Sequence, residues 1–118
     1  MDDAEMSRVT NAILVANVGP LEKRDSEIDS VNRFLRETNG GGNGEFIEVT
    51  QHAGGTKRME CRVYLSTFNH AETDVILRAV EQAPWREKDT VQVFVKEQEE
   101  EVFVLLYSGR SAQNESSR

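Results

Sequence analysis

Hydrophobic and polar residues follow two different periods along this chain, and the changes of period divide it into strands and helices. Residues 12–18 are apolar almost throughout and end at a Gly-Pro pair, which is typical of a central strand that is covered on both sides. In residues 59–66 the apolar positions 59, 61, 63 and 65 alternate strictly with the positions between them, and in residues 91–96 valine occupies every second position. Both segments therefore indicate half-buried strands. Residues 45–50 and 102–107 are the other predicted strands, and the last of them is apolar throughout.

Two further segments show the helical period instead. In residues 25–38 the apolar side chains recur every three or four positions, and acidic residues at the start suit the helix dipole. Residues 69–83 repeat this spacing. Asn69 and Glu72 form a variant of the capping box, and Pro84 ends the segment. We therefore predict one helix between the first two strands and another between the third and the fourth.

This order predicts an α+β domain, a two-layer sandwich with the sequence β-α-β-β-α-β-β. The first six elements match the ferredoxin-like arrangement, in which right-handed crossovers pack both helices on one face of an antiparallel sheet. The fifth strand is expected to form a hairpin with the fourth and to extend the sheet as an added C-terminal edge strand. Residues 1–8 are predicted to be a flexible arm, residues 9–107 the single domain and residues 108–118 a disordered tail.

Composition narrows the class of protein. The chain has 118 residues, with 14 Lys and Arg against 21 Asp and Glu, which gives a formal net charge of -7. No apolar run approaches the roughly 20 residues that cross a bilayer, and the N-terminus is acidic, so we expect a cytoplasmic protein with no membrane contact. Nucleic-acid affinity comes largely from Lys and Arg at phosphates, so the acidic balance argues against a nucleic-acid partner.

The sheet face turned away from the helices is the most informative predicted feature. If the valines of residues 91–96 face the helices, then Phe94 lies on the other face, and the same reasoning places Tyr64 there. The last strand adds either Phe103, Leu105 and Tyr107 or Val102, Val104 and Leu106. Such a patch exceeds what solvated monomers usually expose. It predicts a surface for a partner or a second copy, unless the arm, the glycine link or the tail lies across it.

Four carboxylates crowd the turn before the last strand, at Glu97, Glu99, Glu100 and Glu101. They lack the spacing of a calcium loop, so we predict no metal site there. One interpretation is a solvated turn that protects the edge of the sheet from aggregation. The other is an acidic protrusion that docks into a basic cleft of another protein, because complementary charge speeds association and selects partners.

The remaining residues with reactive groups form no recognisable site in the sequence. Cys61 is expected to pack in the core with its strand neighbours, as free cysteines usually do. His52 and His70 have no partner residue at metal-ligand or catalytic-triad spacing. The glycines of residues 40–44 follow a helix rather than a strand, so they predict a flexible connection and not a phosphate loop. No cofactor is expected, and a site assembled from distant residues stays open.

These patterns favour a non-enzymatic module that binds another protein. Its concrete form would be an acidic inhibitor or immunity-type protein that plugs a basic active site, as the net charge and the acidic turn suggest. One alternative is a homodimeric ligand-sensing or regulatory domain that pairs its two open sheet faces. The other is a small dimeric enzyme, with His52 or His70 pointing into a cavity between the sheets.

Overall fold

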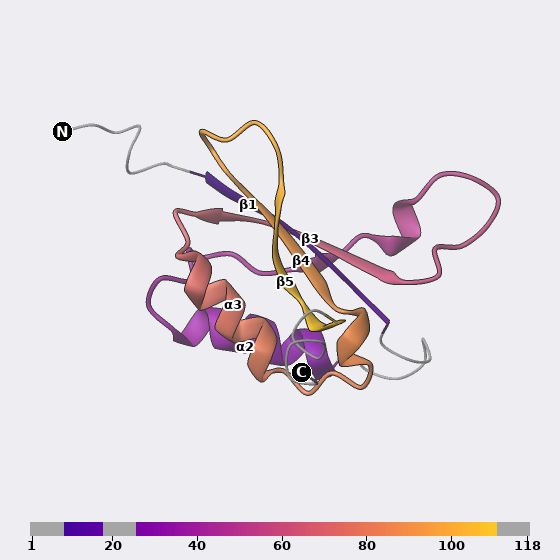
Figure 1. The fold of residues 1–118 in the computed structure, drawn as a ribbon, viewed down its shortest axis with the longest axis horizontal. Coiled ribbons are helices and arrows are strands. Elements are labelled where there is room, and N and C mark those ends of the chain that lie inside the picture. Colours follow the sequence, from indigo (N-terminus) through magenta and orange to yellow (C-terminus); the bar gives the residue numbers. More distant parts are fainter. Residues whose placement is uncertain (1–8, 18–25, 111–118) are drawn as a thin grey trace.

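The computed structural model describes residues 9–17 and 26–110, and within them five strands form one antiparallel sheet packed against two helices (Figure 1). The strands are β1 (Val9–Ala16), β2 (Ile47–Glu48), β3 (Arg62–Asn69), β4 (Gln92–Glu97) and β5 (Val104–Ser108). The helices are α2 (Ser26–Glu37) and α3 (Thr73–Gln82), with short 3-10 turns at η1 (Thr50–His52) and η2 (Lys88–Thr90). The strand order is β2-β3-β1-β4-β5.

β1 is the central strand, as its almost continuous apolar run predicted, but the helices cover only one of its two sides and not both. It pairs antiparallel with β3 on one side and with β4 on the other. β5 pairs antiparallel with β4 and forms one edge of the sheet, with a bulge between Val93 and Phe94 that shifts the register. β2 forms the other edge and is shorter than the predicted strand of residues 45–50, because only Ile47 and Glu48 pair with β3.

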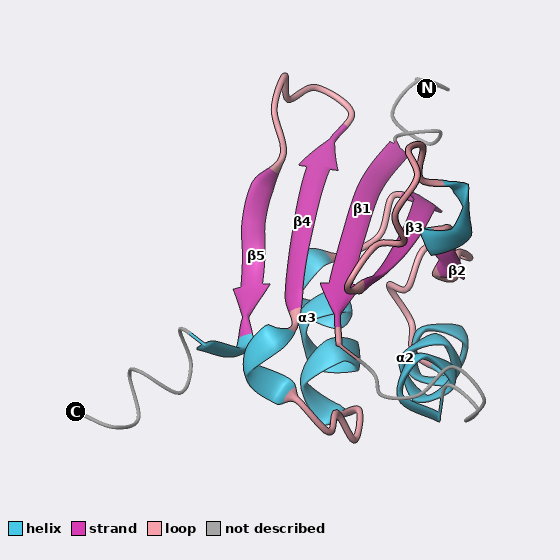
Figure 2. Ribbon diagram, turned by 90° about the vertical axis from the view of Figure 1, so that its right-hand side faces the viewer, coloured by secondary structure: helices cyan, strands magenta, loops and turns pink. Residues whose placement is uncertain are grey.

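Both helices lie on one side of the sheet (Figure 2), and a single core fills the space between the two layers. Val31 and Leu35 of α2 are buried there, as are Ile76 and Val80 of α3. The spacing of three and four residues predicted these positions, because that spacing gathers apolar side chains on one helix face. The sheet contributes every second residue of its central strands, of which Leu14 is fully buried.

The third strand was predicted with the wrong face inward. It begins at Arg62 rather than at residue 59, and its buried residues are Arg62, Tyr64, Ser66 and Phe68. Leu65, which the sequence placed inside, is 43% exposed. Since side chains alternate between the two faces of a strand, an error of one residue in the predicted alternation assigns every side chain of β3 to the wrong face.

Aromatic bulk explains this orientation. Tyr64 and Phe68 fill the space beneath the helices, and the ring of Phe68 meets that of Phe46 edge-on at 5.7 Å between centroids. Arg62, at the start of the strand, places its guanidinium Nη1 3.2 Å from Oε1 of Glu48 on the neighbouring strand. Its charge therefore has a partner at the edge of the buried face.

The glycine-rich link, residues 40–44, is a packed connection and not the flexible one that the sequence predicted. The backbone carbonyls of Gly40 and Gly42 accept hydrogen bonds from the amides of Glu72 and Asn69, at 2.8 and 2.7 Å. Gly42 has a φ of 74°, and a Cβ added there would lie 2.7 Å from Cβ of Phe68. Glycine is required at this position because the backbone presses directly against the end of β3.

The structure also places two element boundaries at other residues than the sequence predicted. Asn69 is the last residue of β3, so it does not cap the second helix, which begins at Thr73 after Glu72. Ser108 ends β5, so the tail predicted from residue 108 starts too early. The predicted arm, residues 1–8, and the rest of the tail, residues 111–118, lie outside the described residues.

Candidate functional site

A row of apolar side chains crosses the face of the sheet that points away from the helices. The register places Ile47 of β2 opposite Leu65 of β3, and Leu65 opposite Ile13 of β1. Ile13 lies opposite Phe94 of β4, and Phe94 lies opposite Leu105 of β5. Directly opposite residues share one face of a sheet. These five residues, the apolar row, therefore form a band across all five described strands.

The apolar row is largely accessible to solvent. Ile47, Leu65 and Leu105 are 56%, 43% and 49% exposed, and Ile13 and Phe94 are half-buried. Single exposed apolar residues are common on protein surfaces, but a contiguous band of them marks an interaction site. The face that carries the row, the open face, is thus the strongest candidate site among the described residues.

Phe103 makes part of the open face concave. It belongs to the connection between β4 and β5, yet it lines a cavity of about 520 Å³ together with Ile47, Leu65 and Thr67. β4 and β1 separate β5 from β3, so this cavity extends across the open face from the connection between β4 and β5 to β3 and β2. Asn11 and Thr67 add polar groups to a wall that is otherwise mainly apolar.

The structure divides the four aromatic residues that the sequence assigned to a binding surface. Phe94 lies in the apolar row and Phe103 beside it. Tyr64 and Tyr107 are 1% and 6% exposed and belong to the core on the helix side, so their predicted place on the open face is wrong. Tyr64 is buried because β3 turns toward the helices the face that was predicted to point away from them. Tyr107 is buried because it pairs with Val93, which also faces the helices.

Tyr107 carries a buried polar group with no evident structural use. Its hydroxyl has no hydrogen-bond partner among the described residues. Burial, together with the nearby carboxylate of Glu81, raises the pKa of Tyr107 above its ordinary value, because both disfavour the charged phenolate. The ring therefore acts as a core side chain and stays neutral at physiological pH.

The acidic hairpin, residues 97–101, combines two kinds of glutamate. Glu97 is half-buried: its Oε1 accepts a hydrogen bond from the Thr10 hydroxyl at 2.9 Å. Oε1 of Glu100 accepts a hydrogen bond from the backbone amide of Glu97 at 3.0 Å and so closes the turn. Glu99 and Glu101 are exposed. Glu97 and Glu100 thus make the hydrogen bonds that stabilise the hairpin, and Glu99, Glu100 and Glu101 are all exposed at its tip.

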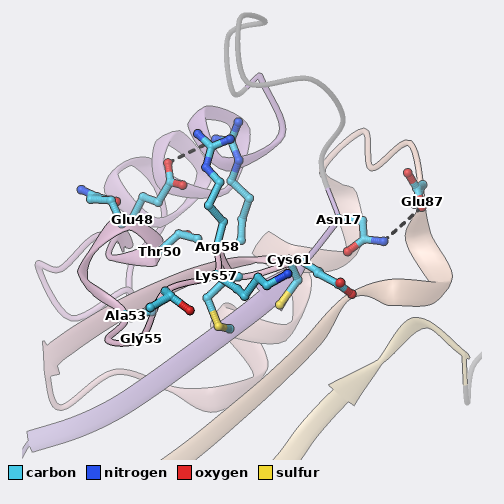
Figure 3. A pocket seen from close by; sticks show the side chains of 14 residues that line it. Asn17, Glu48, Thr50, Ala53, Gly55, Lys57, Arg58, Cys61 and Glu87 are labelled. Carbon is cyan, nitrogen blue, oxygen red and sulfur yellow. Dashed lines mark hydrogen bonds and ion pairs between the residues drawn. The ribbon is translucent and has the colours of Figure 1, made fainter.

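The loop of residues 51–61, here the basic loop, borders a second cavity of about 680 Å³ (Figure 3). Its first ten residues are exposed, and Lys57 and Arg58 outnumber the single carboxylate of Glu60. The guanidinium of Arg62 lines the same cavity and forms an ion pair with Glu48. The loop thus carries an excess of one positive charge, but the cavity that it borders has a balanced lining of Lys57, Arg58 and Arg62 against Glu48, Glu60 and Glu87.

Cys61 lies in the wall of this cavity, half-buried, and not in the core as the sequence predicted. It precedes the first residue of β3, so the strand alternation that suggested its burial does not apply to it. His52 is exposed in η1 and His70 is exposed between β3 and α3. Across residues 9–17 and 26–110, no group of three or more His, Cys, Asp or Glu side chains is placed to hold a metal ion.

Glu27 is a buried carboxylate that the sequence reading did not single out. It is 1% exposed in the first turn of α2, and its Oε2 lies 3.7 Å from Nε of Arg86. The guanidinium of Arg86 thus supplies the nearest opposite charge to this buried carboxylate. Glu27 therefore joins α2 to the chain after α3 and takes no part in the open face.

No family model, curated protein or solved structure matches this chain. Neither of the two described helices is long and apolar enough to cross a membrane. The open face must therefore be interpreted from its own chemistry.

Proposed function

We propose that this chain is a non-enzymatic module that binds another protein through the open face of its sheet. The observation that carries the proposal is the apolar row, which runs across all five described strands. Protein interfaces combine an apolar centre with a polar rim. The row supplies the centre, and Asn11 and Thr67 at its border supply polar groups for the rim.

The side chains of the row favour binding over catalysis. Isoleucine, leucine and phenylalanine carry no nucleophile, no titratable group and no ligand atom for a metal. They contribute area that is removed from water when a partner covers it, at about 25 cal/mol per Å². A surface of this kind recognises shape and apolar chemistry.

We also infer a ferredoxin-like topology with one added edge strand. Its support is the place of β1 between β3 and β4, the element order β-α-β-β-α-β, and the position of β5 outside β4. A two-layer fold of this type covers one sheet face with helices and leaves the other without a layer. The inferred topology therefore accounts for an uncovered face in a protein of this size.

One observation favours a second candidate, an acidic inhibitor or immunity-type protein. The acidic hairpin projects from one end of the sheet (Figure 1) and keeps Glu99 and Glu101 exposed. Such a hairpin suits a basic cleft on a target, where opposite charge speeds association. In this case the contact would centre on the tip of the hairpin and not on the apolar row.

A photo-crosslinking experiment in the native cell tests the proposal and separates the two candidates. A photoreactive phenylalanine analogue replaces Leu65 in one variant, Glu101 in a second and Arg78 in a third. Arg78 is exposed on α3, behind the sheet, and serves as the matched control. We expect a covalent complex of one defined mass from position 65 and none from position 78.

A complex from position 101 alone would favour the inhibitor interpretation. Equal products from positions 65 and 78, or none from position 65, would contradict binding through the open face. The mass of the product also distinguishes a second copy of this chain from a different protein.

A further inference from the structure

The cavity beside Phe103 occupies one part of the open face and has the size of a small-molecule site. Its volume is about 520 Å³, and pockets for small ligands usually hold about 300 to 1,000 Å³. Ile13, Ile47 and Leu65 of the apolar row form its wall together with Phe103. These side chains give the cavity the apolar lining that is usual for such pockets.

The polar groups of the cavity are mainly hydrogen-bond acceptors. The amide nitrogen Nδ2 of Asn11 donates to the backbone carbonyl of Lys96 at 3.0 Å. This bond fixes the amide and leaves Oδ1 of Asn11 as its available acceptor. Thr67 lies opposite Asn11 on β3 and adds a hydroxyl, and Glu45 adds a carboxylate. A ligand that donates hydrogen bonds therefore suits this set of groups.

Glu45 gives the cavity its charge. Of the described residues that line the cavity, it is the only one with an ionisable side chain. Oε1 of Glu45 lies 3.4 Å from Nη1 of Arg36, but Arg36 lines the neighbouring groove along α2 and not this cavity. Both side chains are exposed, so their ion pair is weak and Oε2 of Glu45 is left for a second donor. The described lining thus carries one negative charge and no positive one.

We infer that this cavity binds a small organic cation, a compact apolar body that carries an ammonium group. The apolar body lies against Ile13, Leu65 and Phe103, whose surfaces are thereby removed from water. An aromatic body fits best, because the ring of Phe103 then packs against it edge to face or offset. The ammonium group lies beside Glu45 and donates a hydrogen bond to its carboxylate.

This inference goes beyond the proposed function, because it assigns an occupant to the cavity independently of a protein partner. The two sites share Leu65, which belongs both to the apolar row and to the cavity wall. A bound cation covers Leu65 and competes with a protein partner for it. A small molecule in the cavity thus controls access to one part of the open face.

Three indole compounds of nearly equal shape test the assignment. Tryptamine carries an ammonium group, tryptophol carries a hydroxyl at the same place, and indole-3-acetate carries a carboxylate. Each compound is titrated into the ¹⁵N-labelled chain at neutral pH, and nuclear magnetic resonance follows the amide shifts. Tryptamine has about twelve non-hydrogen atoms, so at a common ligand efficiency we expect a dissociation constant of roughly 2 mM. The saturable shifts should lie at the amides of Ile47, Leu65 and Thr67.

The charged group of the ligand should decide the order of affinity. We expect tryptophol to bind about three- to fivefold more weakly than tryptamine, because it keeps the apolar contacts but loses the charge pair. Indole-3-acetate should bind more weakly still, since its carboxylate meets that of Glu45. Phe103→Ala should weaken tryptamine and tryptophol to the same degree, because it removes part of the apolar wall.

Two charge variants locate the recognition. Glu45→Gln should abolish the preference for tryptamine over tryptophol. Glu37→Gln is the matched control, because it removes the same charge from an exposed residue at the end of α2, outside the cavity lining. This control should keep the native preference.

Four results would overturn the inference. They are the absence of a saturable shift with tryptamine, shifts confined to α2 and α3, equal affinity for tryptamine and tryptophol, and an equal effect of the two charge variants. The last would show that the net charge of -7 alone attracts the cation. None of these results affects the proposed function, which the photo-crosslink from position 65 tests without any small molecule.

Discussion

Leu14 and Leu65 offer a matched test of the two faces of the sheet. They lie on the adjacent strands β1 and β3, and the same substitution to alanine applies to both. Leu14 points toward the helices and is 0% exposed, whereas Leu65 belongs to the apolar row and is 43% exposed. The two variants should therefore differ sharply in stability, and in the opposite sense in association.

The magnitudes follow from burial. Each substitution removes three carbons, which are worth about 2.4 kcal/mol when fully buried, at about 0.8 kcal/mol each. At Leu14 a cavity adds to this loss, so we expect Leu14→Ala to lower the free energy of unfolding by about 3 to 5 kcal/mol. At Leu65 about half of the transfer term applies and water fills the space, so we expect a loss of about 1 kcal/mol.

Urea unfolding followed by circular dichroism measures both losses, at a protein concentration low enough that association does not contribute. Sedimentation at high concentration then compares association, and we expect Leu65→Ala to weaken it. If Leu65→Ala cost as much stability as Leu14→Ala, another part of the monomer would have to cover Leu65. The open face would then be an interior surface, and the reasoning that makes it a binding site would fail.

Three further predictions concern residues outside the apolar row. Gly42→Ala should lower the free energy of unfolding by more than about 2 kcal/mol, because strain at positive φ adds to a steric clash. Gly54→Ala is the control: nothing lies within 4 Å of its new Cβ, so the same urea titration should show little change in the free energy of unfolding. Because the pKa of Tyr107 is raised in the fold, its neutral form contributes stability that is complete below about pH 10 and lost as the pH rises through the folded pKa. Tyr107→Phe should therefore flatten this alkaline loss, and a variant with an unchanged alkaline profile would assign the loss to other groups. Cys61 is half-buried in a cavity wall and should react with a thiol reagent in the folded protein; labelling only after denaturation would place it in the core.

The parts of the fold that the sequence predicted are those where only one arrangement buries the apolar residues. The helices were located because Val31 and Val80 belong to stripes that leave the opposite helix faces polar. The position of Phe94 on the open face followed from β4, where Val93 and Val95 mark the inner face without ambiguity. In such segments the pattern and the packing agree.

The errors arose where both faces of a strand are apolar. Tyr64 and Leu65 are adjacent, and both are suitable for burial, so alternation alone cannot decide which of them faces the helices. The choice is made by Phe68, beyond the predicted end of that strand, which packs against Phe46 from a distant segment. The place of Ile13 on the open face could not be predicted for the same reason, because β1 is apolar on both faces. Tertiary contacts, and not local pattern, determine these faces.

The glycine link illustrates a different limit of sequence interpretation. Several glycines in succession indicate flexibility when nothing else is known. Here Gly42 is needed because β3 passes too close for any side chain. Only the position of Phe68, far away in sequence, reveals that requirement.

Cross-saturation in nuclear magnetic resonance tests most directly the claim that the open face is the surface through which this chain associates. A deuterated, ¹⁵N-labelled chain is mixed with an unlabelled protonated chain, and the aliphatic protons of the unlabelled copy are irradiated. We expect the amide signals of Ile13, Leu65 and Phe94 to lose intensity, while those of α2 and α3 keep theirs. Losses confined to the helices or to the edge strand β5, or no losses at all, would contradict the account.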